Sequence, residues 1–245
     1  DGRVNLCRCR RKRLARCQQC DYQDRDLFHA CLQTGVTQDT TACRLSKTNG
    51  STTKSICVYC GSNAGQDPAF LEVADRLGQI MALRGIELVY GGGRVGLMGR
   101  IADATLAAGG RVVGVIPEFL ALKEIAHMEL TTLHVVKSMH ARKAKMEQLS
   151  EGFIAMPGGI GTMEEMFEIW TWAQLGQHRH PVGLLNVNGY YDELVAFLDK
   201  MTEQGFLAPE HRGALIVADR PTKLLDAFEA YKPPPADVRI KTGQT

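Results

Sequence analysis

Seven short runs of apolar residues, each followed by a longer stretch, constrain the fold of this 245-residue chain more than any other feature. Most of the longer stretches repeat apolar residues three or four positions apart, as Ala74, Leu77 and Met81 do, which is typical of an amphipathic helix. Several of the short runs lead directly into glycine or proline, which is typical of strands. We expect strands at 55–59, 86–90, 112–116, 130–136, 153–156, 182–187 and 215–218. We expect helices at 67–84, 97–108, 139–149, 162–175, 190–203 and 221–231.

This alternation predicts the fold class. Strands that are apolar along their whole length are buried on both faces, as in a parallel sheet. Alternation with helices favours an α/β fold, a Rossmann-like doubly wound, mainly parallel sheet with helices on both faces. Ligands of such sheets bind at the carboxyl ends of the strands. We therefore expect the functional site in the loops that follow Tyr59, Tyr90, Ile116, Val136 and Met156.

The first fifty residues differ in composition from the rest of the chain. They begin at Asp1 and carry 10 Lys and Arg against 5 Asp and Glu, whereas the remainder carries 19 against 22. Their arginines could bind nucleic acid and their cysteines zinc, but the cysteine spacing fits no zinc module and apolar periodicity is absent. We expect residues 1–50 to be a disordered or artefactual extension. We expect one Rossmann-like domain at 51–232 and a disordered tail at 233–245.

Charge and cysteine content suggest where the main part of the chain resides. No stretch approaches the roughly 18 consecutive apolar residues of a membrane span, so we expect no membrane partner. The net negative charge of residues 51–245 argues against a nucleic-acid partner. Cys57 and Cys60 are the only cysteines there, which favours a cytoplasmic location. They form a Cys-x-x-Cys pair, but Cys57 lies inside an expected strand and should pack in the core rather than act in redox chemistry.

Two of the expected loops are rich in glycine. The first holds Gly91, Gly92 and Gly93 and reaches Gly96, between a strand and a helix. It matches the dinucleotide fingerprint, in which amides at a helix N-terminus bind phosphate. The acidic residue that should bind the ribose would fall near Glu118, which is poorly placed, and a tight turn is the alternative.

The second glycine loop carries carboxylates. It reads Pro157-Gly158-Gly159-Ile160-Gly161-Thr162-Met163-Glu164-Glu165. Its glycines would let the backbone approach a phosphate, and Thr162 could cap the following helix. Two such loops suit a mononucleotide held between them. Glu164 and Glu165 would point about 100° apart on a helix and so cannot share one role.

A third stretch places cations at a helix start. Arg142 and Lys143 follow Met139 and oppose the helix dipole there, which an anionic ligand would explain and a solvated basic face would also allow. We expect His140 to cap or pack rather than to catalyse. Ser62, directly after Gly61, is a candidate phosphate or ribose contact.

These three stretches occur in the same order as in a known family. Gly91-Gly92-Gly93-x-x-Gly96-Leu97-Met98, Met139-His140-x-Arg142-Lys143-x-x-Met146 and Pro157-Gly158-Gly159-x-Gly161-Thr162-x-x-Glu165 resemble the Lonely Guy (LOG) cytokinin-activating phosphoribohydrolases. The similarity continues through Trp172-Ala173-Gln174-Leu175-Gly176 and Gly189-Tyr190-Tyr191-Asp192, and it covers about residues 55–232.

The resemblance implies a reaction and a set of site residues. The reaction is hydrolysis of the N-glycosidic bond of an N6-substituted AMP to free base and ribose 5-phosphate, and the domain is then a nucleotide hydrolase. The family's catalytic pair corresponds to Arg142 and Glu165. Its substrate contacts correspond to Glu124, Arg142, Lys143, Gly158, Gly159, Ile160, Gly161, Thr162, Met163, Glu164 and Thr171, to which we add Gly91, Gly92, Gly93 and Ser62.

The resemblance leaves the mechanism and the substrate open. Glu165 would stabilise an oxocarbenium-like state, hold the ribose or activate water, and Arg142 would act on the departing base or the phosphate. Relatives have been labelled lysine decarboxylases, but no lysine lies where a pyridoxal phosphate Schiff base would form, so we expect no cofactor and no metal. A general nucleoside 5′-monophosphate nucleosidase and a non-catalytic nucleotide sensor are the alternatives. We expect a homodimer.

Overall fold

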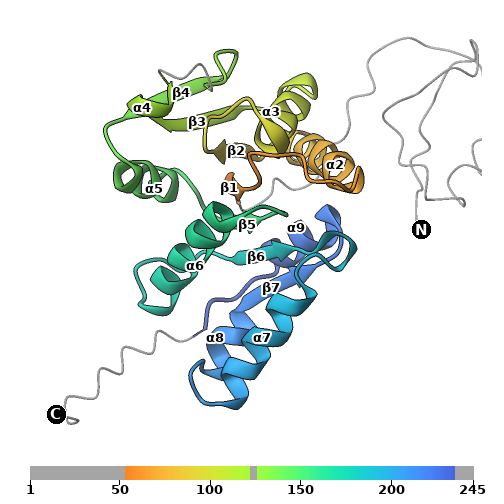
Figure 1. Ribbon diagram of the computed structural model, residues 1–245, viewed down its shortest axis with the longest axis vertical. Helices are drawn as coiled ribbons and strands as arrows, with labels where there is room; N and C mark the ends of the chain where they lie inside the picture. The colour runs from red at the N-terminus through yellow and green to blue at the C-terminus, as the bar shows by residue number, and fades with distance from the viewer. Residues whose placement is uncertain (1–52, 122–125, 235–245) are drawn as a thin grey trace, which may run out of the picture. The chain divides into compact units, whose positions relative to one another are not determined.

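The computed structural model describes residues 53–121 and 126–234, which form a seven-stranded sheet with helices on both faces (Figure 1). All strand pairs of this sheet are parallel, in the order β4-β3-β2-β1-β5-β6-β7. The strands are β1 (Ser55–Tyr59), β2 (Glu87–Tyr90), β3 (Val112–Pro117), β4 (Thr132–Val136), β5 (Phe153–Ala155), β6 (Val182–Leu185) and β7 (Leu215–Ala218). The helices are α2 (Ala69–Leu83), α3 (Gly96–Ala107), α4 (Glu118–Ala121), α5 (Met139–Gln148), α6 (Ile160–Gln174), η1 (Val187–Gly189, a 3-10 turn), α7 (Asp192–Glu203), α8 (Pro209–Ala214) and α9 (Pro221–Glu229).

The expected fold class is confirmed, and every expected strand and helix is present with its ends shifted by at most two residues. Helices α4 and α8 were not expected, because segments of four and six residues are too short to show a helical repeat of apolar positions. The expected extension at 1–50, residues 235–245 of the expected tail and the candidate Glu124 lie outside the described residues.

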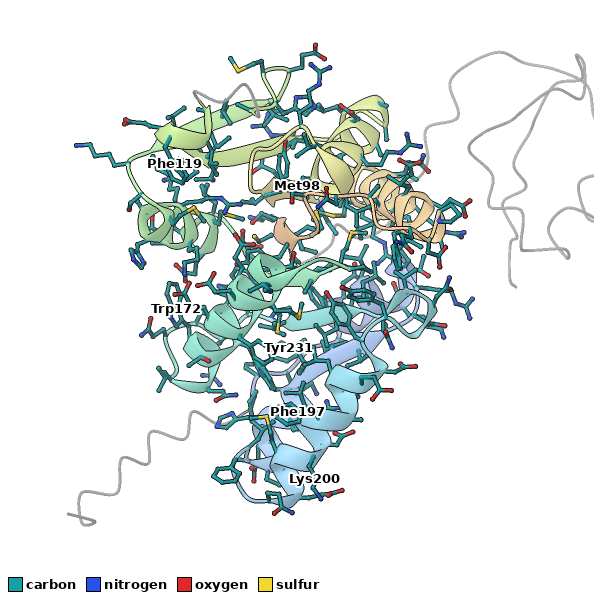
Figure 2. The ribbon with its side chains drawn as sticks, viewed as in Figure 1. Met98, Phe119, Trp172, Phe197, Lys200 and Tyr231 are labelled. Carbon is teal, nitrogen blue, oxygen red and sulfur yellow. The ribbon has the colours of Figure 1, made fainter. Side chains whose placement is uncertain are left out.

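Two apolar cores lie on opposite faces of the sheet, and β1 contributes to both. Alternate residues of a strand point to opposite faces. Ile56 and Val58 therefore join the core under α2, α3 and α9, whereas Cys57 and Tyr59 join the core under α5, α6 and α7. Side chains from the helices fill the space above each face (Figure 2).

The same alternation determines where the two cysteines of the Cys-x-x-Cys pair lie. Cys57 and Cys60 are three positions apart, so they belong to opposite cores, and both are buried free thiols. Burial raises the pKa of both thiols far above the ordinary value. Cys57 therefore packs in a core, as the sequence predicts, and Cys60 packs in the opposite core. The pair is unsuited to disulfide exchange.

The order of the strands places the candidate site. The chain runs from β1 outward through β2, β3 and β4, then returns to β5 on the other side of β1. This reversal is a topological switch point at the carboxyl ends of β1 and β5, the position at which doubly wound sheets bind ligands. Tyr59 pairs with Ala155 at these ends, and just beyond them the Gly61 amide donates to the Pro157 carbonyl at 3.1 Å. The loop after β1 and the second glycine loop are therefore joined directly.

The start of α3 packs against the loop that follows β1. The Leu97 amide donates to the Gly61 carbonyl at 3.1 Å. Gly96 has a φ of 57°, and a Cβ added to it would lie 2.4 Å from the Ser62 carbonyl carbon. Both its backbone conformation and the contact with residue 62 therefore require glycine at this position.

We expect Gly96→Ala to lower the free energy of unfolding more than Gly109→Ala does. Both glycines have positive φ, 57° for Gly96 and 78° for Gly109. The left-handed conformation should therefore cost each alanine variant about 1–2 kcal/mol of stability. Only Gly96 also meets backbone atoms, since a Cβ on Gly109 finds nothing within 4 Å. Overpacking should add about 1–3 kcal/mol at Gly96. Urea unfolding of both variants measures the difference, and equal losses would contradict the tight contact.

Candidate active site

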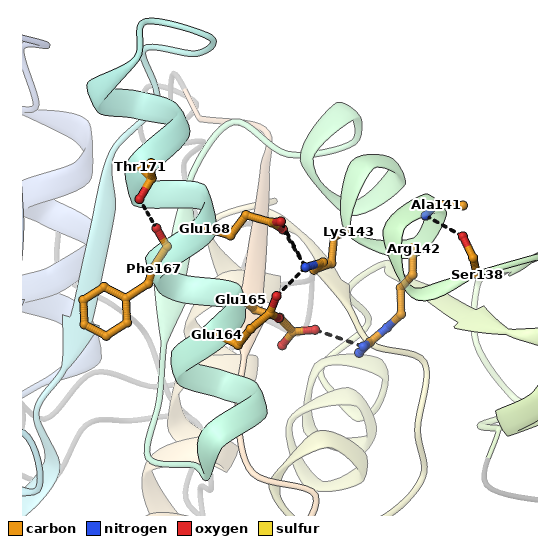
Figure 3. Close-up of polar contacts among 9 residues, drawn as sticks. All are labelled: Ser138, Ala141, Arg142, Lys143, Glu164, Glu165, Phe167, Glu168 and Thr171. Atoms are coloured by element: carbon orange, nitrogen blue, oxygen red, sulfur yellow. Dashed lines mark hydrogen bonds and ion pairs between the residues drawn. The ribbon is translucent and has the colours of Figure 1, made fainter.

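The candidate catalytic residues come from two different helices and meet near the carboxyl ends of β1 and β5. Arg142 extends from the first turn of α5, and Glu165 from the second turn of α6 (Figure 3). The Arg142 Nη1 lies 2.9 Å from the Glu165 Oε1, and each side chain is only 10% exposed. The structure thus brings together two residues that the sequence places 23 positions apart.

Two features of the neighbouring strands hold the Arg142 side chain. Its Nε donates to the Val115 carbonyl at 3.1 Å, near the end of β3. Its guanidinium passes over Gly91, where an added Cβ would lie 2.0 Å from Nη2. The first residue of the expected phosphate fingerprint therefore makes room for the arginine.

Glu165 is buried with unused acceptor capacity. Its Oε1 is buried without a hydrogen bond, because the nearby guanidinium is not aligned to donate to it. Burial raises the pKa of Glu165 above its ordinary value, and the charge of Arg142 opposes this shift. A buried carboxylate of this kind is suited to interact with a proton or a positive charge that appears during a reaction.

Lys143 belongs to a separate charge cluster. Its Nζ donates to Glu164 and, at 3.0 Å, to Glu168, and both carboxylates lie on α6 (Figure 3). Burial opposes the charge of Lys143, but the two hydrogen bonds raise its pKa overall. Glu164 and Glu165 thus pair with different cations, as their helical positions predict.

The structure provides an intramolecular reason for the two cations at the start of α5. Arg142 and Lys143 are both 9% exposed, so they do not form a solvated basic face. Carboxylates of α6 already balance their charge, so an anionic ligand is not needed to explain them. The N-cap of this helix is Ser138, whose Oγ accepts from the Ala141 amide at 3.1 Å. The expectation that His140 caps or packs is wrong, because Ser138 is the cap and the His140 side chain, two residues further along the chain, is exposed.

The second glycine loop leads directly into α6. The helix begins at Ile160 with Gly159 as its N-cap, so the expectation that Thr162 caps it is wrong. Thr162 lies inside the first turn instead, buried against Gly158. Ile160 is 90% exposed, and added Cβ atoms on Gly159 and Gly161 would meet nothing within 4 Å. The surface of this loop is therefore open, and the first amides of the helix point away from its body.

The three consecutive glycines of the first glycine loop, Gly91 to Gly93, are buried. Gly92 accepts a hydrogen bond from the His127 amide at 2.9 Å, and Gly93 forms a bridge with Ala126. His127 is held in turn by the Asp103 carboxylate at 2.8 Å. The structure gives this loop a packing role, and its contact with a ligand stays a prediction.

The remaining candidates lie at different distances from the paired charges. Ser62 is exposed on the loop after β1, and Met163 is half-buried beside the second glycine loop. Thr171 is exposed two turns along α6 from Glu165, and its hydroxyl donates to the Phe167 carbonyl at 2.7 Å (Figure 3). The structure does not bring Thr171 next to the glycine loop of its own chain.

Tyr190 and Tyr191 contact the second glycine loop, and the sequence analysis gave them no role. Their hydroxyls donate to the Gly158 and Met156 carbonyls at 2.7 and 2.6 Å. The only signal in the sequence was their position within the stretch that resembles the family. Their proximity depends on the pairing of β5 with β6, which no local pattern reveals.

The described residues contain neither a group of three or more His, Cys, Asp and Glu suited to a metal ion nor a helix long and apolar enough to cross a membrane.

Comparison with known proteins identifies the family of this chain. Residues 98–228 match a family described as "Possible lysine decarboxylase". Rice (Oryza sativa subsp. japonica) "Probable cytokinin riboside 5'-monophosphate phosphoribohydrolase LOGL5" is 49% identical over 182 residues, 74% of each chain. Arabidopsis thaliana "Cytokinin riboside 5'-monophosphate phosphoribohydrolase LOG7" is 47% identical over 180 residues, 74% of this chain and 83% of that one. This chain belongs to the LOG family of cytokinin riboside 5′-monophosphate phosphoribohydrolases.

Solved structures support the fold assignment. A molybdenum cofactor binding protein from Rippkaea orientalis superposes with a TM-score of 0.56 at 25% identity, covering 72% of this chain and 96% of that chain. The molybdenum cofactor carrier protein from Chlamydomonas reinhardtii gives a TM-score of 0.57 at 24% identity with the same coverage. These similarities concern the fold alone.

The description as a possible lysine decarboxylase does not suit the site. Schiff-base chemistry needs a lysine amine with a lowered pKa. Among the described residues, Lys143 is the lysine that lies beside the Arg142–Glu165 pair, and its two carboxylate partners raise its pKa. Lys143 is therefore held in the charged form, which cannot attack a carbonyl.

Proposed function

We propose that this protein hydrolyses the N-glycosidic bond of cytokinin riboside 5′-monophosphates, releasing the free base and ribose 5-phosphate. The observation that carries the proposal is the buried Arg142–Glu165 pair at the carboxyl ends of the strands, beside an open glycine loop at a helix start. The curated relatives with this activity in their names share nearly half of the aligned residues.

The 5′-phosphate binds at the start of α6 in this proposal. Amides from Gly158 to Thr162 donate to the phosphate, and the helix dipole favours its charge. Ser62 and Gly91 to Gly93 border this position, and Met163, Glu164, Lys143 and Glu124 complete the substrate contacts. Thr171 is too far along α6 to reach a nucleotide held by the loop of its own chain, so its contact would require a second copy.

Glu165 and Arg142 act on the bond that breaks. Cleavage develops positive charge at the anomeric carbon, which the Glu165 carboxylate stabilises. The carboxylate also takes the proton from the attacking water, and this proton passes to the departing base, so that the neutral free base leaves and Glu165 is ionised again. Arg142 holds Glu165 in place and steadies the negative charge that develops on the departing base. Binding energy from the phosphate orients the ribose between them.

Product analysis tests this function. We expect purified protein to release free isopentenyladenine from N6-isopentenyladenosine 5′-monophosphate and none from the unphosphorylated riboside. AMP, assayed in parallel, should react more slowly. Equal cleavage of AMP would show a general nucleosidase, and binding without cleavage of any substrate would show a nucleotide sensor.

We also propose that the protein is a cytoplasmic homodimer. Leu175, the C-cap of α6, is an apolar residue that is 64% exposed, and Trp172 lies in the last turn of the same helix (Figure 2). A second copy that covers this helix would bury them and bring a second Thr171 toward the site. Light scattering during size-exclusion chromatography of the purified protein checks the dimer. The free thiols of Cys57 and Cys60 suit a reducing compartment.

A further inference from the structure

Three successive carbonyls of the second glycine loop are each held by a donor from another part of the chain. The Met156 carbonyl accepts from the Tyr191 hydroxyl at 2.6 Å. The Pro157 carbonyl accepts from the Gly61 amide at 3.1 Å. The Gly158 carbonyl accepts from the Tyr190 hydroxyl at 2.7 Å. The rotation of three consecutive peptide groups is therefore fixed.

The held carbonyls determine where the loop's amides point. In a trans peptide the N–H points opposite to the C=O of the same plane. The bond to Pro157 thus directs the Gly158 N–H away from Gly61, and the bond to Gly158 directs the Gly159 N–H away from Tyr190. Neither N–H has an acceptor among the described residues. Both are free to donate, together with the first amides of α6.

The segment that carries the two tyrosines is itself rigidly anchored. The Asn186 side chain accepts from the Tyr191 amide and donates to Asp192, both at 2.7 Å. Asn188 donates to Asp67 at 2.8 Å, which ties the η1 turn to the residues before α2. These bonds fix the backbone on both sides of Tyr190.

Aromatic packing fixes the ring of Tyr190. It lies edge-on to Phe70, with 5.6 Å between ring centroids, and edge-on to Tyr191, with 4.9 Å. Edge-to-face pairs of this kind hold ring orientation. The hydroxyl of Tyr190 is therefore positioned before any ligand arrives.

We infer that Tyr190 is a positioning residue that holds the second glycine loop in the conformation that binds the 5′-phosphate, and that Tyr191 stabilises the start of the same loop. This inference rests on the proposed function. Both hydroxyls approach the loop on its carbonyl side, whereas the phosphate binds on its amide side. Tyr190 therefore does not need to touch the substrate to affect its binding.

The two tyrosines should differ in their effects. Tyr191 is 2% exposed and holds the Met156 carbonyl, whose peptide has no N–H because Pro157 follows. Its hydroxyl therefore contributes to stability. Tyr190 is 46% exposed and holds the peptide that contains the Gly159 N–H. Its hydroxyl therefore contributes to phosphate affinity.

We expect Tyr190→Phe to raise the Kd for inorganic phosphate and the KM for the nucleoside monophosphate by about 2- to 10-fold, as loss of one neutral hydrogen bond allows. We expect kcat to change less than twofold, because the Arg142–Glu165 pair is untouched. Titration calorimetry and steady-state kinetics measure these values. Tyr191→Phe should lower the melting temperature instead.

Tyr231→Phe is the matched control. Tyr231 lines a different pocket with Trp170 and His178, so its hydroxyl should not affect phosphate binding. The inference is overturned if Tyr190→Phe leaves both the phosphate Kd and KM unchanged, if it lowers kcat alone, or if Tyr231→Phe has the same effect. Failure of the proposed function would appear in the wild-type protein, which would release no base, and the phosphate Kd would still decide the role of Tyr190.

Discussion

Glu165→Gln is expected to lower kcat by about 10²- to 10⁴-fold, the usual contribution of a positioned acid or base. Glutamine has the size and shape of glutamate but carries no charge, so it can neither stabilise an oxocarbenium-like state nor take a proton from water. Nucleotide affinity should remain close to that of the wild type, because the phosphate is bound by backbone amides. Rapid-quench kinetics and calorimetry with the monophosphate separate the two quantities.

The same variant should also change the dependence of stability on pH. Burial raises the pKa of Glu165 in the folded protein above its value in the unfolded chain. The folded state therefore binds the proton more tightly, and the free energy of unfolding falls as the pH rises between these two pKa values. Glutamine does not titrate. The free energy of unfolding of Glu165→Gln, relative to that of the wild type, should therefore increase as the pH rises through that interval. Urea unfolding at a series of pH values measures it.

Glu203→Gln serves as the control for this experiment. Glu203 is exposed on α7, where it pairs with Lys200 at 3.3 Å. Its replacement should leave kcat unchanged. Turnover by Glu165→Gln within about threefold of the wild type would rule out the role given to the carboxylate.

Gly91→Ala is the second change with a large expected effect, although Gly91 carries no side chain. The new Cβ would lie 2.0 Å from the Arg142 Nη2, so the guanidinium has to move. Its Nε is held by the Val115 carbonyl at 3.1 Å, which limits the adjustment. A displacement of about 1 Å in a catalytic group can cost 10²-fold in rate, and we expect a loss of that order in kcat/KM.

A double-mutant cycle distinguishes this effect from general damage. If Gly91 acts through Arg142, then Gly91→Ala should have little further effect in a protein that already carries Arg142→Ala. Gly213→Ala is the control, since a Cβ there meets nothing within 4 Å. Additive losses in the double variant would show that Gly91 acts independently of the arginine.

Local patterns in the sequence predicted the elements of the fold but failed at two helix starts. Runs such as 55–59 identify buried strands, because burial on both faces requires apolar residues throughout. Thr162 was expected to cap α6 and His140 to cap or pack at α5, but Gly159 and Ser138 are the caps. Cap position depends on where the backbone leaves the helical conformation, which side-chain preference alone does not fix.

The candidate site was only partly accessible from the sequence. The resemblance to the LOG family pointed to Arg142 and Glu165 but not to what surrounds them. The guanidinium of Arg142 packs against Gly91, which lies about 50 positions earlier in the chain. The Tyr190 hydroxyl donates to the Gly158 carbonyl, 32 positions earlier. Such contacts depend on which strands become neighbours, and no periodicity encodes that.

The sequence by itself determined the seven strands, the helices between them and the loops in which the site lies. These follow from interactions between residues close together in the chain. The tertiary structure alone decided that α6 carboxylates balance the cations of α5, that a buried glycine makes room for the Arg142 side chain, and that two tyrosines hold the second glycine loop. These contacts join segments that the order of the strands brings together, and the packing of distant segments sets the distances over which charges and hydrogen bonds act.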